Sequence, residues 1–211
     1  MKDFDRKKHW ETIYNTKELK DVSWFQKTPL TSIDLITQLE LPKTSKIIDV
    51  GGGNSLLADH LLDLGYTNIT VLDISETAIN KAKERLGNLA RNVIWIVADI
   101  ANFMPTEKYD IWHDRAAFHF LNDKKEINHY MNSLEYGIQP NGFLIMGTFS
   151  ENGPKKCSKI DITQYSETSM NNLVKNSFEK VKCTYIDHKT PFDTLQNFIF
   201  CIFKKGKTTL M

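Results

Sequence analysis

The chain has 211 residues, of which 41% are hydrophobic and 25% are charged, the balance of a globular protein. Lys and Arg number 27 against 26 Asp and Glu, a net charge of +1, which excludes the strongly basic footprint of proteins that wrap nucleic acid or coat anionic membranes. No apolar run reaches the ~18 residues of a membrane span, and the charged start leads into no signal-peptide core. We therefore expect no nucleic-acid partner and no membrane partner.

The cysteine content predicts neither a disulfide framework nor a zinc site. Cys157, Cys183 and Cys201 are odd in number, and no two of them have C-x-x-C spacing. Disulfides are rare in the reducing cytosol. We therefore expect a cytoplasmic protein without bound metal.

The first 45 residues predict two helices. Residues 2–20 are polar with aromatic side chains such as Trp10, and they predict a short helix that Pro29 separates from the next one. Residues 31–41 carry apolar side chains at helical spacing. Pro42 ends this helix, because proline cannot continue one.

From residue 46 onward, strands and helices alternate along the chain. The run 93–97 is apolar on both faces, which is typical of a parallel strand covered by helices. The turn signal Pro140-Asn141-Gly142 precedes the fifth strand. The predicted strands are residues 47–50, 69–74, 93–97, 109–112, 143–149, 181–187 and 198–204, and the predicted helices are residues 54–64, 75–86, 124–136 and 167–177.

The last two predicted strands are joined by too few residues for a crossover helix, so they must pair antiparallel. The order of elements predicts an α/β fold with a doubly wound, Rossmann-like seven-stranded sheet, mostly parallel with a C-terminal antiparallel hairpin. In such folds, ligands bind at the carboxyl ends of the strands.

A glycine turn and two acids point to a nucleotide-like cofactor. Gly51, Gly52 and Gly53 follow the first strand, where glycine lets a ligand approach the backbone. Asp73 ends the second strand 22 residues after Gly51, a spacing that suits a carboxylate accepting ribose hydroxyls, and Asp99 follows the third strand.

The charge next to the turn indicates which cofactor is bound. A dinucleotide site needs a third glycine three residues after Gly53, but that residue is Leu56. Asp49, just before the turn, would repel a pyrophosphate and attract a cationic sulfonium or amino group. These residues favour S-adenosylmethionine over NAD.

Residues 46–149 resemble the class I (seven-β-strand) S-adenosylmethionine-dependent methyltransferases. IIDVGGGNS (47–55) resembles their first motif, with Ser55 where a third glycine is common, VLDIS (71–75) their ribose motif and VADI (97–100) their adenine motif. The resemblance implies that residues 46–211 form the methyltransferase domain. It also implies that the cofactor is held by Asp49, Gly51, Gly52, Gly53, Asn54, Asp73, Ile74, Asp99 and Ile100.

The end of the fourth strand is the expected place of the methyl acceptor. IWHDRAAF (111–118) is similar to a stretch of elongation-factor-type lysine methyltransferases, which implies that Asp114 faces the acceptor, although Arg115 and Ala116 depart from that pattern. His113 is expected beside Asp114 and the cofactor, and His119 is a candidate acceptor contact. The chain lacks the Asn/Asp-Pro-Pro-aromatic motif there, which disfavours DNA and glutamine acceptors.

The aromatic residues near the start resemble the amino-terminal lid of the same subgroup. This resemblance implies that residues 1–45 form a helical lid segment in which Trp10 and Trp24 close over the cofactor. We therefore predict a methyltransferase that acts on an amine, such as a protein lysine. The open alternatives are a small-molecule thiol, amine or oxyanion acceptor, a non-catalytic cofactor-binding scaffold, and a nicotinamide dehydrogenase.

Overall fold

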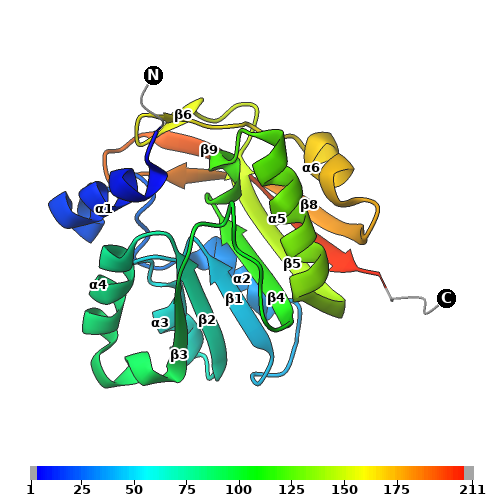
Figure 1. Ribbon diagram of the computed structural model, residues 1–211, viewed down its shortest axis with the longest axis horizontal. Coiled ribbons are helices and arrows are strands. Elements are labelled where there is room, and N and C mark those ends of the chain that lie inside the picture. Colours follow the sequence, from blue (N-terminus) through cyan, green and yellow to red (C-terminus); the bar gives the residue numbers. More distant parts are fainter. Residues whose placement is uncertain (1–3, 207–211) are drawn as a thin grey trace.

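The computed structural model describes residues 4–206, which form a central sheet with helices on both faces (Figure 1). The order of its seven strands is β3-β2-β1-β4-β5-β9-β8. Strands β1 to β5 are parallel, whereas β9 runs antiparallel to β5 and to β8. The predicted fold class is confirmed. The strands are β1 (Lys46–Val50), β2 (Asn68–Asp73), β3 (Val93–Val97), β4 (Tyr109–Arg115), β5 (Ile138–Phe149), β8 (Phe178–Lys189) and β9 (Leu195–Lys205).

The helices divide the apolar side chains of the sheet into two cores. Helices α2 and α3 pack on one face, and α5 and α6 pack on the other. Helix α4 lies beside α3, where Arg85 pairs with Asp59 at 2.8 Å. The α-helices are α1 (Arg6–Thr16), α2 (Leu30–Thr37), α3 (Leu57–Asp63), α4 (Glu76–Leu86), α5 (Lys124–Gly137) and α6 (Glu167–Val174), and the 3-10 helices are η1 (Leu19–Asp21), η2 (Gly87–Asn92) and η3 (Phe118–Phe120).

Most predicted helices begin or end within a few residues of the observed ones. Ser75 caps α4 as expected, its hydroxyl accepting from the amide of Ala78. The helix predicted over 54–64 begins later, because residues 51–56 are used by the turn. The start of the helix predicted over 2–20 lies outside the described residues. Among the helices of residues 4–206, none combines the length and the apolar composition that a bilayer crossing requires.

Strand β4 is longer than predicted, and this changes where its side chains point. It continues through His113, Asp114 and Arg115. Successive residues of a strand face opposite sides of the sheet. His113 and Arg115 therefore face the side of α2 and α3, whereas Asp114 faces the side of α5.

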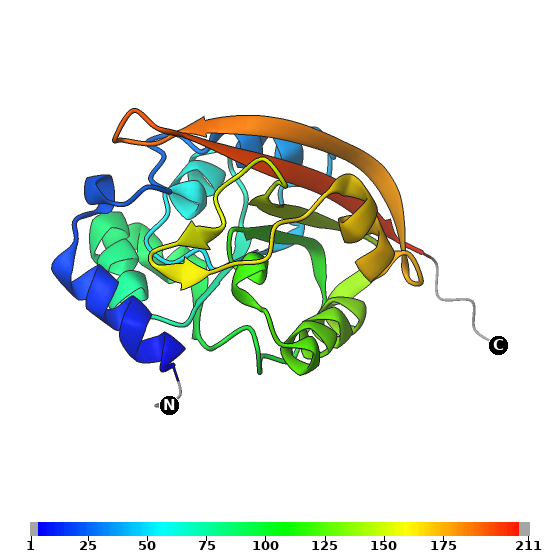
Figure 2. The same ribbon diagram turned by 90° about the horizontal axis from the view of Figure 1, so that it is seen from above.

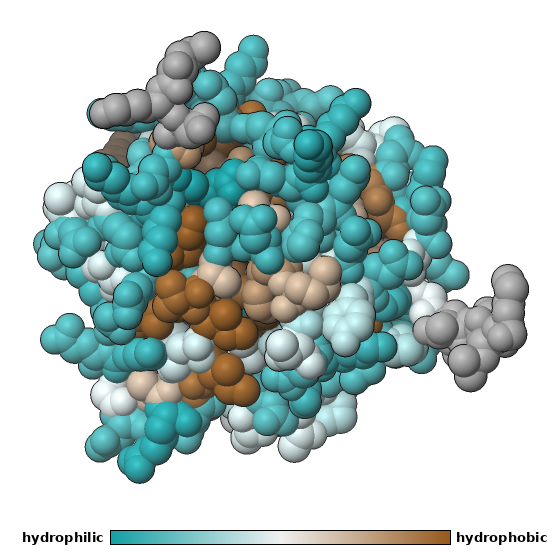
Figure 3. All heavy atoms as spheres, viewed as in Figure 1, coloured by the Kyte–Doolittle hydropathy of each residue, from teal (hydrophilic) through white to brown (hydrophobic). Residues whose placement is uncertain are grey.

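Strands β3 and β5 also differ from expectation. β3 is parallel as predicted, but it is an edge strand in which Ile94 is 55% and Val97 is 43% exposed, so helices do not cover both its faces. Hydrophobic surface is visible over the β3 region in Figure 3. β5 already begins at Ile138, and Asn141, with a φ of 64°, belongs to an irregularity in its pairing with β4.

A small hairpin that the sequence did not predict lies between β5 and α6. It consists of β6 (Lys156–Cys157) and β7 (Ile160–Asp161). Ser158 and Lys159 connect them with φ values of 50° and 69°, as a two-residue turn of the primed type requires. Figure 2 shows the hairpin in yellow over the sheet, on the same side of the view as α1.

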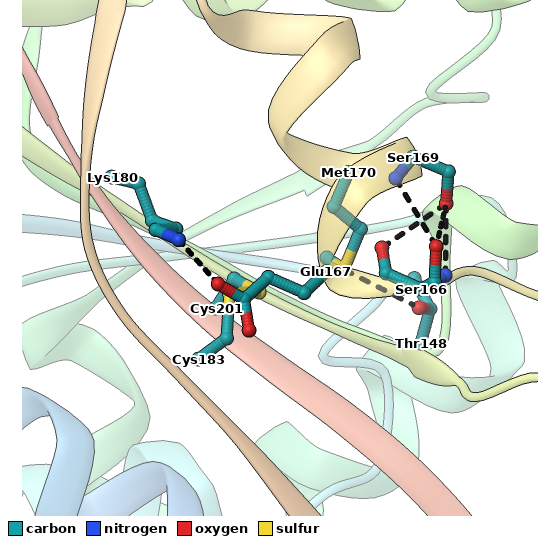
Figure 4. Close-up of a disulfide and its surroundings, with 8 residues drawn as sticks. All are labelled: Thr148, Ser166, Glu167, Ser169, Met170, Lys180, Cys183 and Cys201. Carbon is teal, nitrogen blue, oxygen red and sulfur yellow. Dashed lines mark hydrogen bonds and ion pairs between the residues drawn. A yellow bond between two sulfur atoms is a disulfide. The ribbon is translucent and has the colours of Figure 1, made fainter.

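The prediction that the cysteines form no disulfide was wrong, because Cys183 of β8 and Cys201 of β9 form one (Figure 4). The two residues are directly opposite in the antiparallel pair, with Cα atoms 4.1 Å apart. Spacing along the chain cannot reveal this, since the register of the two strands brings the thiols together. Cys157 is a free, buried thiol.

Candidate functional site

A cavity lies where β1, β2 and β4 end, at the point where the strand order reverses on either side of β1. The glycine turn forms its floor: the amide of Gly51 donates to the carbonyl oxygen of Leu72 at 2.7 Å, which ties the turn to β2. The predicted residues that line the cavity are Trp10, Trp24, Asp49, Gly51, Gly52, Asp73, Ile74, Asp99, Ile100 and His113.

The glycines of the turn leave no space for side chains. Gly51 has a φ of +69°, and a Cβ on it would lie 2.6 Å from the Cβ of Ala117. A Cβ on Gly52 would lie 2.4 Å from Oδ2 of Asp49. The turn therefore needs glycine for its conformation and for the close approach of the Asp49 carboxylate.

Asp73 presents a buried carboxylate at the end of β2. Its Oδ1 accepts from the amide of Ser75 at 2.8 Å, and Oδ2 faces the glycine turn, where a Cβ on Gly53 would lie 2.7 Å away. Burial raises the pKa of Asp73 to about 7. A carboxylate with one oxygen left for a ligand suits a donor such as a ribose hydroxyl.

His113 joins Asp49 to α2 through buried hydrogen bonds. Its Nδ1 lies 2.7 Å from Oδ1 of Asp49, and its Nε2 lies 2.9 Å from Oγ of Ser32. Since an ionised carboxylate can only accept, we assign the Nδ1 proton as the donor to Asp49 and the Ser32 hydroxyl as the donor to Nε2. Both ring nitrogens are thus used inside the protein, and Ser32 has no signal in the sequence that would have identified it.

Helix α1 is attached to the adenine-motif acid by Arg6. The Nη1 of Arg6 donates to both oxygens of Asp99 at 3.0 Å, and its Nη2 donates to Oε2 of Glu126 at 2.8 Å. Burial alone would lower the pKa of Arg6, but the hydrogen bond to Glu126 and the charge of Asp99 raise this pKa overall. One guanidinium therefore joins α1 to the loop after β3 and to α5.

A second attachment joins α1 to the start of α4. The carboxylate of Glu11 accepts from the Ser75 hydroxyl at 3.0 Å and from the amide of Glu76 at 2.7 Å. A negative charge is favourable at a helix N-terminus, where unpaired amides point outward. Figure 2 shows α1 next to α4.

The aromatic side chains of the N-terminal segment lie together over the cavity. Trp10 makes edge contacts with Trp24 at 5.7 Å and with Phe120 at 5.1 Å between ring centroids. Tyr14 lies 6.4 Å from Trp24 and also lines the cavity. The described part of the predicted lid segment thus covers the cavity with aromatic surface.

Asp114 is not part of the cavity lining. It is fully buried, and its carboxylate accepts from the Tyr130 hydroxyl at 2.6 Å and from the amides of Ala117 and Phe118 at 3.0 and 3.1 Å. Burial raises the pKa of Asp114 to about 6. The structure places it where it holds the chain that follows β4, and its predicted contact with the acceptor stays a prediction.

His119 and Asn54 also lie away from the cavity lining. Nδ1 of His119 accepts from the amide of Phe149 at 3.3 Å, and burial together with the charge of Arg115 lowers the pKa of His119 to about 3. Asn54 accepts a hydrogen bond from Arg85 through its side-chain oxygen. Their predicted contacts with acceptor and cofactor are likewise untested.

Arg115 is the main lining residue to which the sequence assigned no role in binding. It lines this cavity and a second, more open cavity of about 470 Å³, together with Phe25 and Gln26. Extending the predicted fourth strand by three residues would have placed Arg115 on the same face as His113. Cys157, on the unpredicted hairpin, also lines the first cavity, and burial raises its pKa to about 11.

The residues that line the cavity suit the predicted cofactor. Two buried carboxylates, Asp49 and Asp73, suit a sulfonium cation and ribose hydroxyls. Aromatic walls and the side chain of Ile100 suit an adenine ring. The glycine turn lacks the G-x-G-x-x-G sequence, whose backbone amides bind the pyrophosphate of a dinucleotide.

Comparison with known proteins agrees with this assignment. Residues 41–200 match the family profile of the methyltransferase domain. Malonyl-[acyl-carrier protein] O-methyltransferase 2 of Ilyobacter polytropus is 29% identical over 106 residues, half of this chain but only 39% of that protein. EEF1A lysine methyltransferase 2 of Danio rerio is 26% identical over 155 residues, 66% of each chain.

A solved structure shows the same fold. The N-methyltransferase NodS from Bradyrhizobium japonicum, in complex with S-adenosyl-L-homocysteine, superposes with a TM-score of 0.70 and covers 95% of this chain and 99% of its own, at 16% identity. The match over residues 41–200, the sheet order and the cavity agree. The chain belongs to the methyltransferase-domain family and has the fold of the class I S-adenosylmethionine-dependent methyltransferases, and S-adenosylmethionine is the cofactor that the lining residues suit.

Proposed function

We propose that this methyltransferase acts on a small acceptor that enters through the second cavity. The observation that carries the proposal is the shared wall: Phe25, Gln26 and Arg115 line both cavities. An acceptor in the second cavity would thus lie next to the cofactor. When bound, S-adenosylmethionine supplies an electrophilic methyl group on a sulfonium.

The residues of this chain would divide the work by position. Asp73 would bind the ribose of the cofactor. Asp49 and the glycine turn would bind its cationic end, and Asp99 and Ile100 would contact its adenine. The Asp49–His113–Ser32 hydrogen bonds would keep β1, β4 and α2 in fixed relation, since each member is buried. The aromatic lid would exclude water, which favours transfer to the acceptor.

A protein lysine, the acceptor predicted from residues 111–118, is the second candidate. The name of the Danio rerio relative favours it. Asp114, the carboxylate on which the lysine prediction depended, accepts from Tyr130 on the other face of the sheet, which supports this candidate less well than the first. We therefore rank the small acceptor first.

The test has two parts, binding and transfer. Calorimetry should show binding of S-adenosylhomocysteine but not of NAD, and Asp73→Ala should weaken it by about 1–3 kcal/mol, because the ribose hydroxyls lose a charged acceptor. With labelled S-adenosylmethionine and a cell extract, the label should appear in the small-molecule fraction. Label confined to protein lysines would select the second candidate instead.

A further inference from the structure

Arg115 is a partly buried residue whose guanidinium forms no ion pair with the rest of residues 4–206. Its Nη1 donates to the carbonyl oxygen of Trp24 at 3.2 Å, whereas Nη2 is buried without a hydrogen-bond partner. The guanidinium lies 5.1 Å from the ring centre of Phe198. Within residues 4–206, no carboxylate lies within 4 Å of it.

An unpaired guanidinium in this position is costly for the free protein. Burial lowers the pKa of Arg115 to about 10, although the charges of Asp49 and Cys157 act in the opposite direction. A buried charge normally pairs with an opposite one. A guanidinium, planar with several donors, matches a carboxylate better than any other biological group except phosphate.

The other ionisable groups of the second cavity favour an anion over a cation, and two of them, Lys27 and Lys189, are themselves cations. His188 contacts the carbonyl oxygen of Ser23 through Nε2 at 2.8 Å, and burial, followed by the charge of Arg115, lowers its pKa. Burial and Arg115 also keep His119 neutral. Asp187, the one acid that lines the second cavity, accepts from Asn197 at 2.6 Å.

The chemistry of deprotonation favours the same type of acceptor. An amine arrives as an ammonium and must lose a proton before it can accept a methyl group. His113, which lines the cofactor cavity, has both nitrogens engaged by Asp49 and Ser32 and is not free to take that proton. A carboxylate is already ionised at neutral pH.

The rest of the second cavity is suited to an apolar body. Its walls include Phe25, Ile186, Phe198 and Phe200, together with Leu30 from the start of α2. A volume of about 470 Å³ is in the range of small-molecule sites. The cavity thus combines apolar walls with the Arg115 guanidinium at the wall that it shares with the first cavity.

We propose that the acceptor is a small apolar carboxylate, and that Arg115 binds its carboxylate group at the wall between the two cavities. One carboxylate oxygen would form the new bond to the methyl carbon as the bond from that carbon to the sulfonium sulfur breaks, so that the products would be a methyl ester and neutral S-adenosylhomocysteine. This inference rests on the proposed function, since it names the chemical class of the acceptor for the same site. It assigns to Arg115 the selection of an anionic acceptor over an amine.

The proposal can be tested by binding, without turnover. Protein saturated with S-adenosylhomocysteine is titrated at pH 7.5 with hexanoate, hexanamide and hexylamine, three probes of equal length, and calorimetry gives the affinities. We expect hexanoate to bind at least ~10-fold more tightly than the other two. In Arg115→Gln, hexanoate should lose roughly 10–100-fold in affinity, the loss expected for a charge-assisted bidentate contact, and Arg115→Lys should retain part of it.

The matched control is Arg91→Gln, the same change at an exposed arginine of η2, which should leave hexanoate affinity unchanged. Titration with S-adenosylhomocysteine alone comes first: failure of the wild-type protein to bind it would contradict the proposed function. Normal cofactor binding with no preference for hexanoate, no binding of any probe, or an unchanged preference in Arg115→Gln and Arg115→Lys would overturn the inference about Arg115 alone.

Discussion

Asp73 is a buried carboxylate whose pKa burial raises to about 7. Hydrogen bonds from ribose hydroxyls and a nearby sulfonium favour the charged form and lower this pKa. We therefore expect cofactor binding at pH 7 to release protons, roughly half a proton per site, because the free carboxyl is about half protonated there. Calorimetric titrations in two buffers of different ionisation enthalpy measure the release.

The same pKa predicts how the ligand-free protein responds to pH. The pKa of an aspartate is about 3.9 in the unfolded chain, whereas that of Asp73 is about 7 in the folded protein. Protonated Asp73 therefore contributes fully to stability below about pH 3.9, and this contribution is lost as the pH rises through 7. Asp73→Asn should therefore gain stability relative to wild type more at pH 8 than at pH 5. Asp63→Asn, at an exposed position of α3, is the control; an equal gain in both variants, or proton uptake on binding, would contradict the role of Asp73.

Asp114 is expected to act on the loop after β4. Asp114→Asn replaces an acceptor of three hydrogen bonds by a group that is partly a donor, so the free energy of unfolding should fall by about 1–3 kcal/mol. Tyr130→Phe removes a single donor and should cost less, about 1 kcal/mol. Urea denaturation measures both. If Asp114→Asn keeps full stability but loses turnover at saturating cofactor, the sequence-based acceptor role is favoured instead.

At the scale of elements, α1 contributes little to the hydrophobic core. None of its residues is fully buried, and it is held by Arg6, Glu11 and the aromatic side chains. Such elements open locally at low free-energy cost. The position of α1 therefore depends on a few polar and aromatic contacts.

Glu11→Gln should loosen the attachment of α1 to α4. Burial alone would raise the pKa of Glu11, but hydrogen bonds from Thr77, Glu76 and Ser75 lower it overall. The ionised carboxylate therefore stabilises the fold above the usual pKa range of glutamate, and this stabilisation is lost in acid. At neutral pH, we expect amide exchange in α1 to speed up by roughly 3–10-fold, consistent with about 1 kcal/mol for a charge at a helix N-terminus. Glu18→Gln, an exposed glutamate in the same segment, should have no effect, and equal exchange in both variants would show that Glu11 does not hold α1.

The disulfide belongs to the scale of the whole molecule, because it joins the two strands that complete the sheet. Figure 4 shows it beneath α6, from which Glu167 pairs with Lys180 of β8 and Met170 contacts Thr148 of β5. Cys201 is fully buried, so the bond lies within the core between β9 and α6.

Breaking this bond should lower thermal stability without changing the fold. A cross-link over 18 residues constrains the unfolded chain by about 3 kcal/mol, which corresponds to roughly 6–12 °C in Tm for a chain of this size. Calorimetry with and without reductant measures the shift. Cys183→Ser should show the lower Tm and no further response to reductant; the same Tm for reduced and oxidised wild type would contradict the expectation.

The amino-acid sequence by itself determined the order of the elements, the glycine turn and the acids at the strand ends. These depend on local rules: hydrophobic periodicity, turn chemistry and the position of polar residues after a buried strand. For this reason the local pattern alone singles out Asp49, Gly51, Asp73 and Asp99, which line the cavity.

Only the tertiary structure decided which side chains meet. Asp114 lies on the face toward α5 because β4 is three residues longer than predicted. The disulfide forms because the register of β8 against β9 places Cys183 opposite Cys201. The ion pair of Arg6 with Asp99 depends on the packing of α1 against the rest of the fold. Only the packed structure also shows that no carboxylate of another described element pairs with Arg115. Contacts between distant segments depend on how whole elements pack, and a pattern of neighbouring residues does not contain that information.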